Sequence, residues 1–104
     1  MTANYFNDLR KMLYYDESFY LAAYADIRDA VDRGQLPSGF EHYIHSGRFE
    51  NRRPNALFDP HFYMARYPGI GQAIAGGMYP GTAFDHFVAS GLWEGRIPSA
   101  VFES

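Results

Sequence analysis

The feature that most limits the possible folds of this chain is an internal duplication. At a shift of 43 residues, nine positions of the stretch from Asp16 to Pro37 meet their own residue types in the stretch from Asp59 to Pro80. One inserted residue after Pro80 changes the shift to 44, and nine further positions match up to the C-terminus. A repeat of this length is one small supersecondary unit, so the rest of the sequence has to be interpreted unit by unit.

The duplication predicts how the 104 residues are organised. Residues 1–14 form an N-terminal helical extension, 15–57 the first repeat and 58–104 the second, together one compact domain. A chain of this length has room for one domain or a pair of small repeats. The apolar residues of the extension have helical spacing, which predicts an amphipathic helix that covers the exposed end of the repeat pair. They are Tyr5, Phe6, Leu9, Met12 and Leu13.

The signals at the start of each repeat are helical. Asp16 and Asp59 stand where N-cap residues belong, and Pro60 is a favoured first residue of a helix. The apolar stripe that follows predicts a short amphipathic helix in each repeat. A second helix is expected over 26–33 and over 70–75, each ending before a glycine that can adopt the left-handed conformation.

A third helix is expected in each repeat, beginning at Ser38 and at Thr82. Each of these residues has an acidic residue three positions later, which is the spacing of a capping box. The helices should end at Gly47 and Gly91, and the tails 48–58 and 92–102 should be extended and end on a buried Phe. No alternating run is long enough for a sheet. The predicted fold class is all-α: two tandem three-helix repeats of about 43 residues preceded by an N-terminal helix.

The aromatic content is high, with 9 Tyr, 9 Phe and 1 Trp. Most of these rings recur in both repeats, and rings at helical spacing usually form a core. We therefore expect a duplicated aromatic core. Its predicted members are Phe19, Tyr20, Tyr24, Phe40, Tyr43, Phe58, Phe62, Tyr63, Tyr67, Phe84, Phe87 and Phe102.

Composition excludes several classes of protein. The absence of cysteine removes disulfides, thiolate nucleophiles and Cys-ligated metals. The formal charge of −3 argues against a nucleic-acid partner. No apolar run approaches the roughly 20 residues of a membrane span, so no membrane insertion is expected. The first residues lack the basic and apolar regions of a secretory signal. We expect cytoplasmic synthesis without a signal peptide, with an exported or virus-like particle as one possible destination.

Two motifs stand at matched places in the two repeats. The first repeat reads Y-D-E-S-F-Y-L-A-A-Y-A-D-I from Tyr15 and H-Y-I-H-S-G-R-F-E-N-R-R-P from His42. The second reads F-D-P-H-F-Y-M-A-R-Y-P-G-I from Phe58 and H-F-V-A-S-G-L-W-E-G-R-I-P from His86. These resemble a bacterial tandem repeat of the form F-D-x-x-Y-Y-L-x-x-N-P-D-V…H-Y-x-x-x-G-x-x-E-G-R-x-P.

That repeat occurs in envelope- and polysaccharide-associated proteins, both appended to glycosyltransferases and in large exported calcium-binding proteins. The resemblance implies this setting but no activity, and it leaves calcium binding open. The chain departs from the pattern at Ala25, Gly69 and Asn51, where Pro, Asp and Gly are usual. These departures loosen the turns without contradicting the fold.

The duplicated polar residues predict structural contacts. His42 and His86 precede an aromatic residue in both repeats, and we expect each imidazole to pack on the Tyr stripe and bond a carbonyl or the nearby Glu. Glu-x-Arg recurs as Glu50 with Arg52 and Glu94 with Arg96. We expect each Arg fork to bind two carbonyls at the end of the third helix, while the Glu caps another backbone group.

No catalytic, metal or cofactor site is predicted. His42 and His45 have the spacing of a metal pair, but Ala89 stands in place of His45 in the second repeat, and the four histidines lack zinc spacing. Glycosidase chemistry needs two carboxyls that face one sugar, and no such pair is visible. No Ser-His-Asp set or nucleotide-binding loop can be assembled.

The loops after the third helices diverge. Arg48, Arg52 and Arg53 form a basic cluster in the first repeat. Leu92 and Ile97 replace two of these charges in the second repeat, and Trp93 stands opposite Phe49. Divergence at matched positions suggests different neighbours for the two loops, with Trp93 as an interface anchor. The interface candidates are Arg48, Arg52, Arg53, Leu92, Trp93 and Ile97. The alternative is that Trp93 only fills the place of Phe49.

Two functions follow from these patterns. The first is a non-catalytic structural or adaptor subunit, not an enzyme, which docks onto a larger oligomeric assembly at the cell surface or on a phage-like particle, as in a spike or attachment component. Its partner is another protein or further copies of the chain. The alternative is a carbohydrate-binding module for capsule or exopolysaccharide, which would use exposed Tyr and the arginine loop that contains Arg48, Arg52 and Arg53. Its predicted sugar-stacking rings are Tyr14 and Tyr79.

Overall fold

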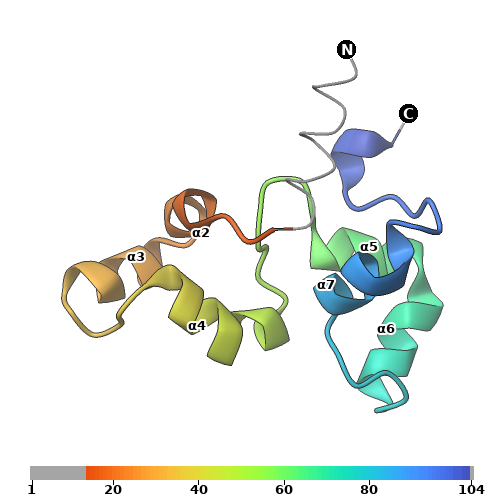
Figure 1. Ribbon diagram of the computed structural model, residues 1–104, viewed down its shortest axis with the longest axis horizontal. Coiled ribbons are helices and arrows are strands. Elements are labelled where there is room, and N and C mark those ends of the chain that lie inside the picture. Colours follow the sequence, from red (N-terminus) through yellow and green to blue (C-terminus); the bar gives the residue numbers. More distant parts are fainter. Residues whose placement is uncertain (1–13, 104) are drawn as a thin grey trace. The chain divides into compact units, whose positions relative to one another are not determined.

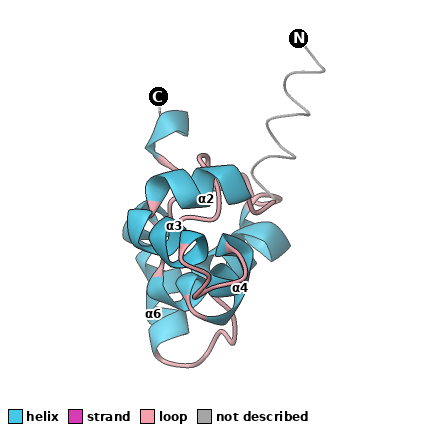
Figure 2. Ribbon diagram, turned by 90° about the vertical axis from the view of Figure 1, so that its left-hand side faces the viewer, coloured by secondary structure: helices cyan, strands magenta, loops and turns pink. Residues whose placement is uncertain are grey.

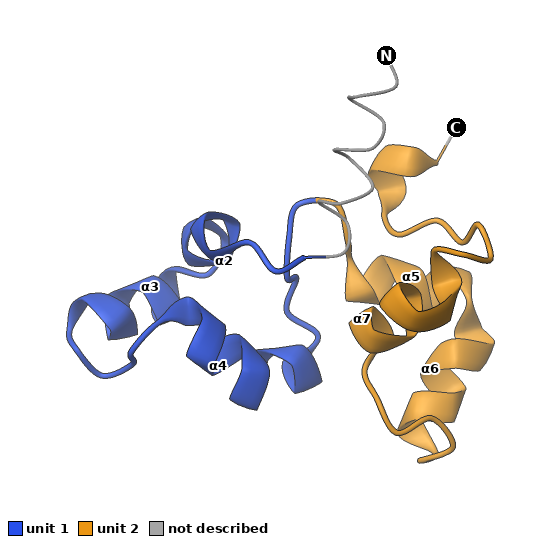
Figure 3. Cartoon of the chain, viewed as in Figure 1, with its two compact units in different colours: residues 1–56 blue, residues 57–104 orange. Residues whose placement is uncertain are grey.

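A computed structural model describes residues 14–103 of the chain. Within this range the chain consists of short helices and connecting loops without a strand (Figures 1 and 2). The predicted all-α class is confirmed. The chain divides into two compact units, Met1–Ala56 and Leu57–Ser104, which we call unit 1 and unit 2 (Figure 3). The helix expected over 1–14 falls outside the described residues, except for Tyr14.

Each unit is built from short helices and helical turns of three to eight residues. Unit 1 contains α2 (Glu17–Ala23), α3 (Ala25–Asp32), α4 (Gly39–His45) and the 3₁₀ turn η1 (Gly47–Glu50). Unit 2 contains α5 (Pro60–Arg66), α6 (Pro68–Ala75), α7 (Ala83–His86), the π-helical turn η2 (Phe87–Gly91) and the 3₁₀ turn η3 (Ala100–Phe102). The second helix of each unit begins earlier than predicted, directly after Tyr24 or Tyr67.

The helix starts follow from their caps. The Asp16 carboxylate accepts a hydrogen bond from the Phe19 backbone N–H at 3.0 Å, and Asp59 caps α5 in the same way. After α3 and α6, Gly34 and Gly77 have φ of 75° and 78°. This left-handed conformation ends a helix and is nearly free of cost only for glycine.

The third helices begin differently in the two units. The full capping box forms at Thr82, whose hydroxyl accepts from the Asp85 N–H while the Asp85 carboxylate accepts from the Thr82 N–H. Ser38 accepts from the Glu41 N–H, but the Glu41 carboxylate lies 3.2 Å from His45 Nε2, one helical turn further on. The capping box predicted at Ser38 is therefore only half formed.

The tails after the third helices are not simply extended. Residues 47–50 form η1, and 100–102 form η3. Phe58 is fully buried as expected, but Phe102 is 38% exposed and Phe40 is 46% exposed. The prediction that all the recurring rings are core residues is therefore wrong for Phe40 and Phe102.

A cluster of rings forms the core of each unit. In unit 1, Tyr20 and Tyr43 are buried, and Tyr15 packs on both with ring centroids 5.4 and 5.2 Å away. In unit 2, Phe58 packs on Tyr63 and Phe87 at 5.3 and 5.2 Å. Tyr15 and Phe58 thus hold the same place, each one residue before the N-cap of its unit.

Each unit also closes on itself. The Asp16 N–H donates to the Pro54 carbonyl at 2.8 Å, and the Asp59 N–H donates to the Pro98 carbonyl at 3.0 Å. The residue that enters the first helix is thereby tied to the proline at the end of the tail. This contact holds the tail, and with it the Glu-x-Arg motif, against the first two helices.

Candidate functional site

A buried tyrosine and a histidine are joined in each unit. Tyr20 Oη lies 2.9 Å from His42 Nδ1, and Tyr63 Oη lies 2.8 Å from His86 Nδ1. The tyrosines come from the first helices and the histidines from the third, so these bonds connect the two across the ring cluster. Within residues 14–103, neither histidine bonds a carbonyl, and His42 lies 3.9 Å from Glu50. The predicted bond to a carbonyl or the nearby Glu is therefore wrong for His86.

Two glycines leave room for these hydroxyl groups. A Cβ at Gly47 would collide with Tyr20 Oη, and a Cβ at Gly91 would collide with Tyr63 Oη. Both glycines have ordinary backbone angles, since the positive φ values belong to other residues. They are required by the close approach of the tyrosine side chain rather than by the backbone conformation.

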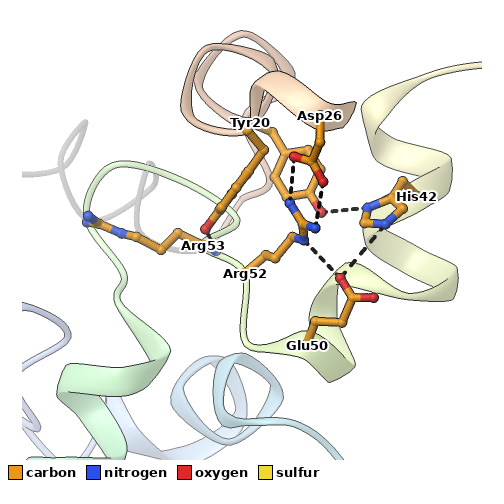
Figure 4. A network of polar contacts seen from close by, with 7 residues as sticks. Tyr20, Asp26, His42, Glu50, Arg52 and Arg53 are labelled. Atoms are coloured by element: carbon orange, nitrogen blue, oxygen red, sulfur yellow. Dashed lines mark hydrogen bonds and ion pairs between the residues drawn. The ribbon is translucent and has the colours of Figure 1, made fainter. Parts of the chain in front are cut away.

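In unit 1, polar contacts continue from the histidine to two carboxylates and an arginine (Figure 4). Arg52 Nε donates to Glu50 Oε1 at 2.8 Å, and His42 Nε2 lies 3.9 Å from the same oxygen. The two Nη atoms of Arg52 donate to the two carboxylate oxygens of Asp26 at 3.1 and 2.9 Å. The Arg52 fork therefore binds carboxylates, so the predicted bonds to two carbonyls are wrong.

The guanidinium of Arg52 is held on an aromatic ring. Its Cζ lies 4.8 Å from the centroid of the Tyr24 ring. The Tyr24 hydroxyl in turn accepts a hydrogen bond from the Arg53 N–H at 2.7 Å. Ring stacking, Glu50 and the fixed tail together orient the two Nη atoms toward the N-terminal turn of α3, where Asp26 lies.

Unit 2 repeats the arrangement in which the motif Glu and a tyrosine ring hold the arginine, which we call the arginine holder. It lacks the carboxylate that binds the two Nη atoms. Arg96 Nε donates to Glu94 Oε1 at 2.9 Å, and Arg96 Cζ lies 4.6 Å from the centroid of the Tyr67 ring. The Tyr67 hydroxyl accepts from the Ile97 N–H at 2.9 Å. Gly69 stands where unit 1 has Asp26. Within residues 14–103, the Nη atoms of Arg96 have no hydrogen-bond acceptor.

Burial and charge keep these groups in their ordinary neutral or charged forms near pH 7. Burial raises the pKa values of Tyr20 and Tyr63, so both hydroxyls stay protonated. Burial, and to a lesser extent Arg96, lowers the pKa of His86, which favours a neutral imidazole. The hydrogen bonds from Arg52 lower the pKa of Asp26 and keep it ionised. None of these pKa shifts moves a group toward proton transfer near neutral pH.

The lowered pKa of Asp26 predicts a pH dependence of unit 1. An acid with a depressed pKa in the folded state stabilises the fold above its unfolded pKa of about 3.9 and loses this contribution as the pH falls. We expect Asp26→Asn to lower the free energy of unfolding at pH 7 by less than about 1 kcal/mol, because the pair is exposed, and so to lower the melting temperature slightly. The difference should shrink toward pH 3 in circular dichroism melts.

Asp29→Asn is the matched control, because Asp29 lies on the same helix and has only a loose contact with Arg28 at 3.7 Å. Its melting temperature should differ little from that of the unsubstituted chain at any pH. An Asp26→Asn difference that stays constant between pH 7 and pH 3 would contradict a role of the ionised carboxylate.

The arginines of the predicted basic cluster bind different acceptors. Arg48 Nε donates to the Ile44 carbonyl at 2.9 Å, and its guanidinium lies over the Phe49 ring at 4.5 Å. Arg53 donates to the Ala56 carbonyl at 2.8 Å. Arg52 is bound by Asp26 and Glu50. Each of the three arginines thus binds an acceptor that the other two do not share in these contacts.

The predicted interface residues of unit 2 differ in exposure. Trp93 is 74% exposed, and its Nε1 donates to the Val88 carbonyl at 3.2 Å. Leu92 and Ile97 are half-buried. Phe49, the counterpart of Trp93, is also exposed. Both units therefore present a ring at this position, and the ring of unit 2 is the larger and is fixed by a hydrogen bond.

The two predicted sugar-stacking rings have different environments. Tyr14 is 59% exposed, and its carbonyl accepts from Asn55 Nδ2 at 2.8 Å. Tyr79 is half-buried and meets the His86 ring edge-on at 5.4 Å. Burial raises the pKa of Tyr79. Tyr79 therefore packs on His86, and of these two rings Tyr14 is the more exposed.

The described part of the chain contains no group of three or more His, Cys, Asp or Glu residues that could hold a metal ion. Among its helices, none has the length and apolarity required to cross a membrane. Comparison of the sequence and the structure with protein-family models, curated proteins and solved structures finds no match.

Proposed function

We propose that this chain is a non-catalytic structural or adaptor subunit that docks onto a larger, oligomeric assembly through the surface around Trp93. The observation that carries the proposal is an exposed indole whose Nε1 is already bound to the Val88 carbonyl. A ring that is fixed before binding loses little conformational freedom on docking. Tryptophan is also the residue type most enriched among the anchors of protein interfaces.

The ionisable side chains support a non-catalytic role. Glu50 and Asp26 are both bound by Arg52, and Glu94 is bound by Arg96. The histidines His42 and His86 are bound to buried tyrosines. In the described residues these groups brace the fold, whereas catalysis needs them directed at a common point where a substrate can sit.

The setting of the assembly follows from the sequence motif. The chain resembles repeats of envelope- and polysaccharide-associated bacterial proteins. A cell-surface structure, or a phage-like particle that attaches to one, is the setting we propose for the subunit. Copies of the chain itself are the partner that the following experiment tests.

We expect Trp93→Ala to weaken assembly. Loss of an interface anchor costs about 2 kcal/mol or more, which raises the dissociation constant about 30-fold. The measurement is the mass of the purified chain, 11.9 kDa as a monomer, by light scattering over a concentration series. The unsubstituted chain should exceed the monomer mass, and Trp93→Ala should approach it with an unchanged helical circular dichroism spectrum.

Phe49→Ala is the control, because it removes an exposed ring at the matched position of unit 1. It should leave the mass unchanged if the Trp93 surface is the docking site. Equal masses for Trp93→Ala and the unsubstituted chain would count against the proposal.

A second candidate function, a carbohydrate-binding module, rests on the exposure of Tyr14. An exposed ring can stack on a sugar face. Co-sedimentation with bacterial capsule polysaccharide, before and after Tyr14→Ala, tests it. Absence of binding by the unsubstituted chain rejects this function.

A further inference from the structure

The two units hold the motif arginine in the same way but differ in what its Nη atoms bind. In unit 1, Asp26 occupies both Nη atoms of Arg52. In unit 2, the residue at the place of Asp26 is Gly69, and the Nη atoms of Arg96 have no acceptor in the described residues. In unit 1 the arginine holder thus binds a carboxylate, and in unit 2 the corresponding Nη atoms have no acceptor within residues 14–103.

The two arginine holders have closely similar geometry. The Nε–carboxylate distances are 2.8 Å for Arg52 and 2.9 Å for Arg96, and the distances from Cζ to the ring centroid are 4.8 and 4.6 Å. Each ring belongs to the residue just before the second helix. Asp26 and Gly69 both stand one residue after the first residue of that helix. The Nη atoms of Arg96 therefore point to the first turn of α6.

The space that Asp26 fills in unit 1 is open in unit 2. A Cβ placed on Gly69 would meet no atom within 4 Å other than its chain neighbours and its own helix backbone. The Arg96 side chain is 32% exposed, against 22% for Arg52. A group from solution can reach the guanidinium without moving the fold.

The other charges around the Tyr67 ring leave Arg96 as the free donor. The guanidinium of Arg66 lies 5.9 Å from the ring centroid, and its Nη1 lies 3.3 Å from a carboxylate oxygen of Glu103. Glu94 occupies Nε of Arg96 but neither Nη atom. The two Nη atoms remain as a planar pair of donors.

We propose that Arg96, beside Gly69 at the start of α6, binds a carboxylate supplied by an acidic side chain of a partner protein. A carboxylate matches the planar guanidinium fork with two parallel hydrogen bonds. The occupant of the matched place in unit 1 is itself an aspartate side chain. That a protein supplies the carboxylate rests on the proposed docking function, whereas the site itself does not depend on it.

Nuclear magnetic resonance of the ¹⁵N-labelled chain tests the site directly. We expect sodium acetate to shift the Arg96 Nε–Hε and Gly69 amide signals with a dissociation constant on the order of 10 mM, because one charge-assisted bidentate contact binds weakly. The Arg52 signal should not move, since Asp26 already occupies its fork. Sodium chloride at equal ionic strength controls for screening. A short Glu-containing peptide should bind more tightly than acetate.

Two variants exchange the residues at this matched position between the units. Gly69→Asp should place a carboxylate on Arg96, abolish the acetate response and give Arg96 a signal like that of Arg52. Asp26→Gly should open a second acetate site at Arg52. Gly69→Asp has room for its Cβ, and an acidic residue in the first turn suits the helix dipole. If this variant fails to fold, Asp26→Gly still decides between the outcomes.

Three results overturn the proposal. They are an acetate response no larger than that to chloride, an acetate response that persists at Arg96 in folded Gly69→Asp, and failure of Asp26→Gly to create a response at Arg52. A trimer of glucuronate that binds more tightly than the Glu peptide would assign the site to a polysaccharide instead of a protein. The expected acetate response at Arg96, together with an unchanged mass for Trp93→Ala, would reject the docking function alone.

Discussion

Gly91→Ala is expected to destabilise unit 2 by about 3 kcal/mol or more. The added Cβ would collide with Tyr63 Oη, which is fully buried and bound to His86 Nδ1. Overpacking costs about 1–3 kcal/mol, and a buried hydroxyl that loses its partner costs about as much again. Domains are stable by only about 5–15 kcal/mol, so this is a large fraction of the total. Urea denaturation followed by circular dichroism measures it.

The same substitution elsewhere in unit 2 provides the control. Gly69→Ala adds a Cβ that meets nothing within 4 Å, and alanine favours a helix, so stability should be unchanged or slightly higher. Adding Tyr63→Phe to Gly91→Ala removes the oxygen that the new Cβ meets and should restore part of the loss. Equal stability of the Gly91 and Gly69 variants would show that the close approach to Tyr63 is unimportant.

Phe58→Ala is expected to destabilise unit 2 by about 3–5 kcal/mol. The ring is fully buried, and its centroid lies 5.1–5.3 Å from those of Tyr63, Phe84 and Phe87. Its removal leaves a cavity among these rings, and the bond between Tyr63 and His86 limits how far Tyr63 can move into it. Thermal and urea denaturation of the folded fraction should both report the loss.

Phe102→Ala is the matched control, since Phe102 aligns with Phe58 in the duplicated sequence but is 38% exposed. It should cost less than about 1 kcal/mol, because much of its surface is already in water. Similar losses for the two substitutions would contradict the assignment of Phe58 to the core and Phe102 to the surface.

The sequence predicted the helical elements well because their signals are local. An Asp or Thr cap, a glycine after the helix and a proline at the helix start act within one turn, so their spacing is visible in the chain. Part of the buried core could be predicted too, since many of its rings recur at a shift of 43 residues. Tyr20 and Tyr63 are the clearest examples, both fully buried as expected.

The long-range polar contacts could not be predicted in this way. Asp26 and Arg52 are 26 residues apart, and neither has a spacing that distinguishes a bidentate pair from two solvated charges. The signal that could have found them is the usual aspartate of the motif at the place of Gly69, considered together with the motif arginine. Phe102 was misassigned because it was aligned with Phe58 at the end of a repeat, whereas the contacts of Phe58 are those of Tyr15 at the beginning of a unit.

The closure of each unit has a consequence for how such a chain can change its length. Because the backbone bonds from Asp16 to Pro54 and from Asp59 to Pro98 join the two ends of a unit, the chain leaves each unit beside the point where it entered. A further unit inserted between Ala56 and Leu57 would bring both partners of its own closing bond. Duplication can therefore add whole units, and deletion can remove them, without rebuilding the existing ones. The residue that binds the motif arginine can then change in one unit without affecting the others.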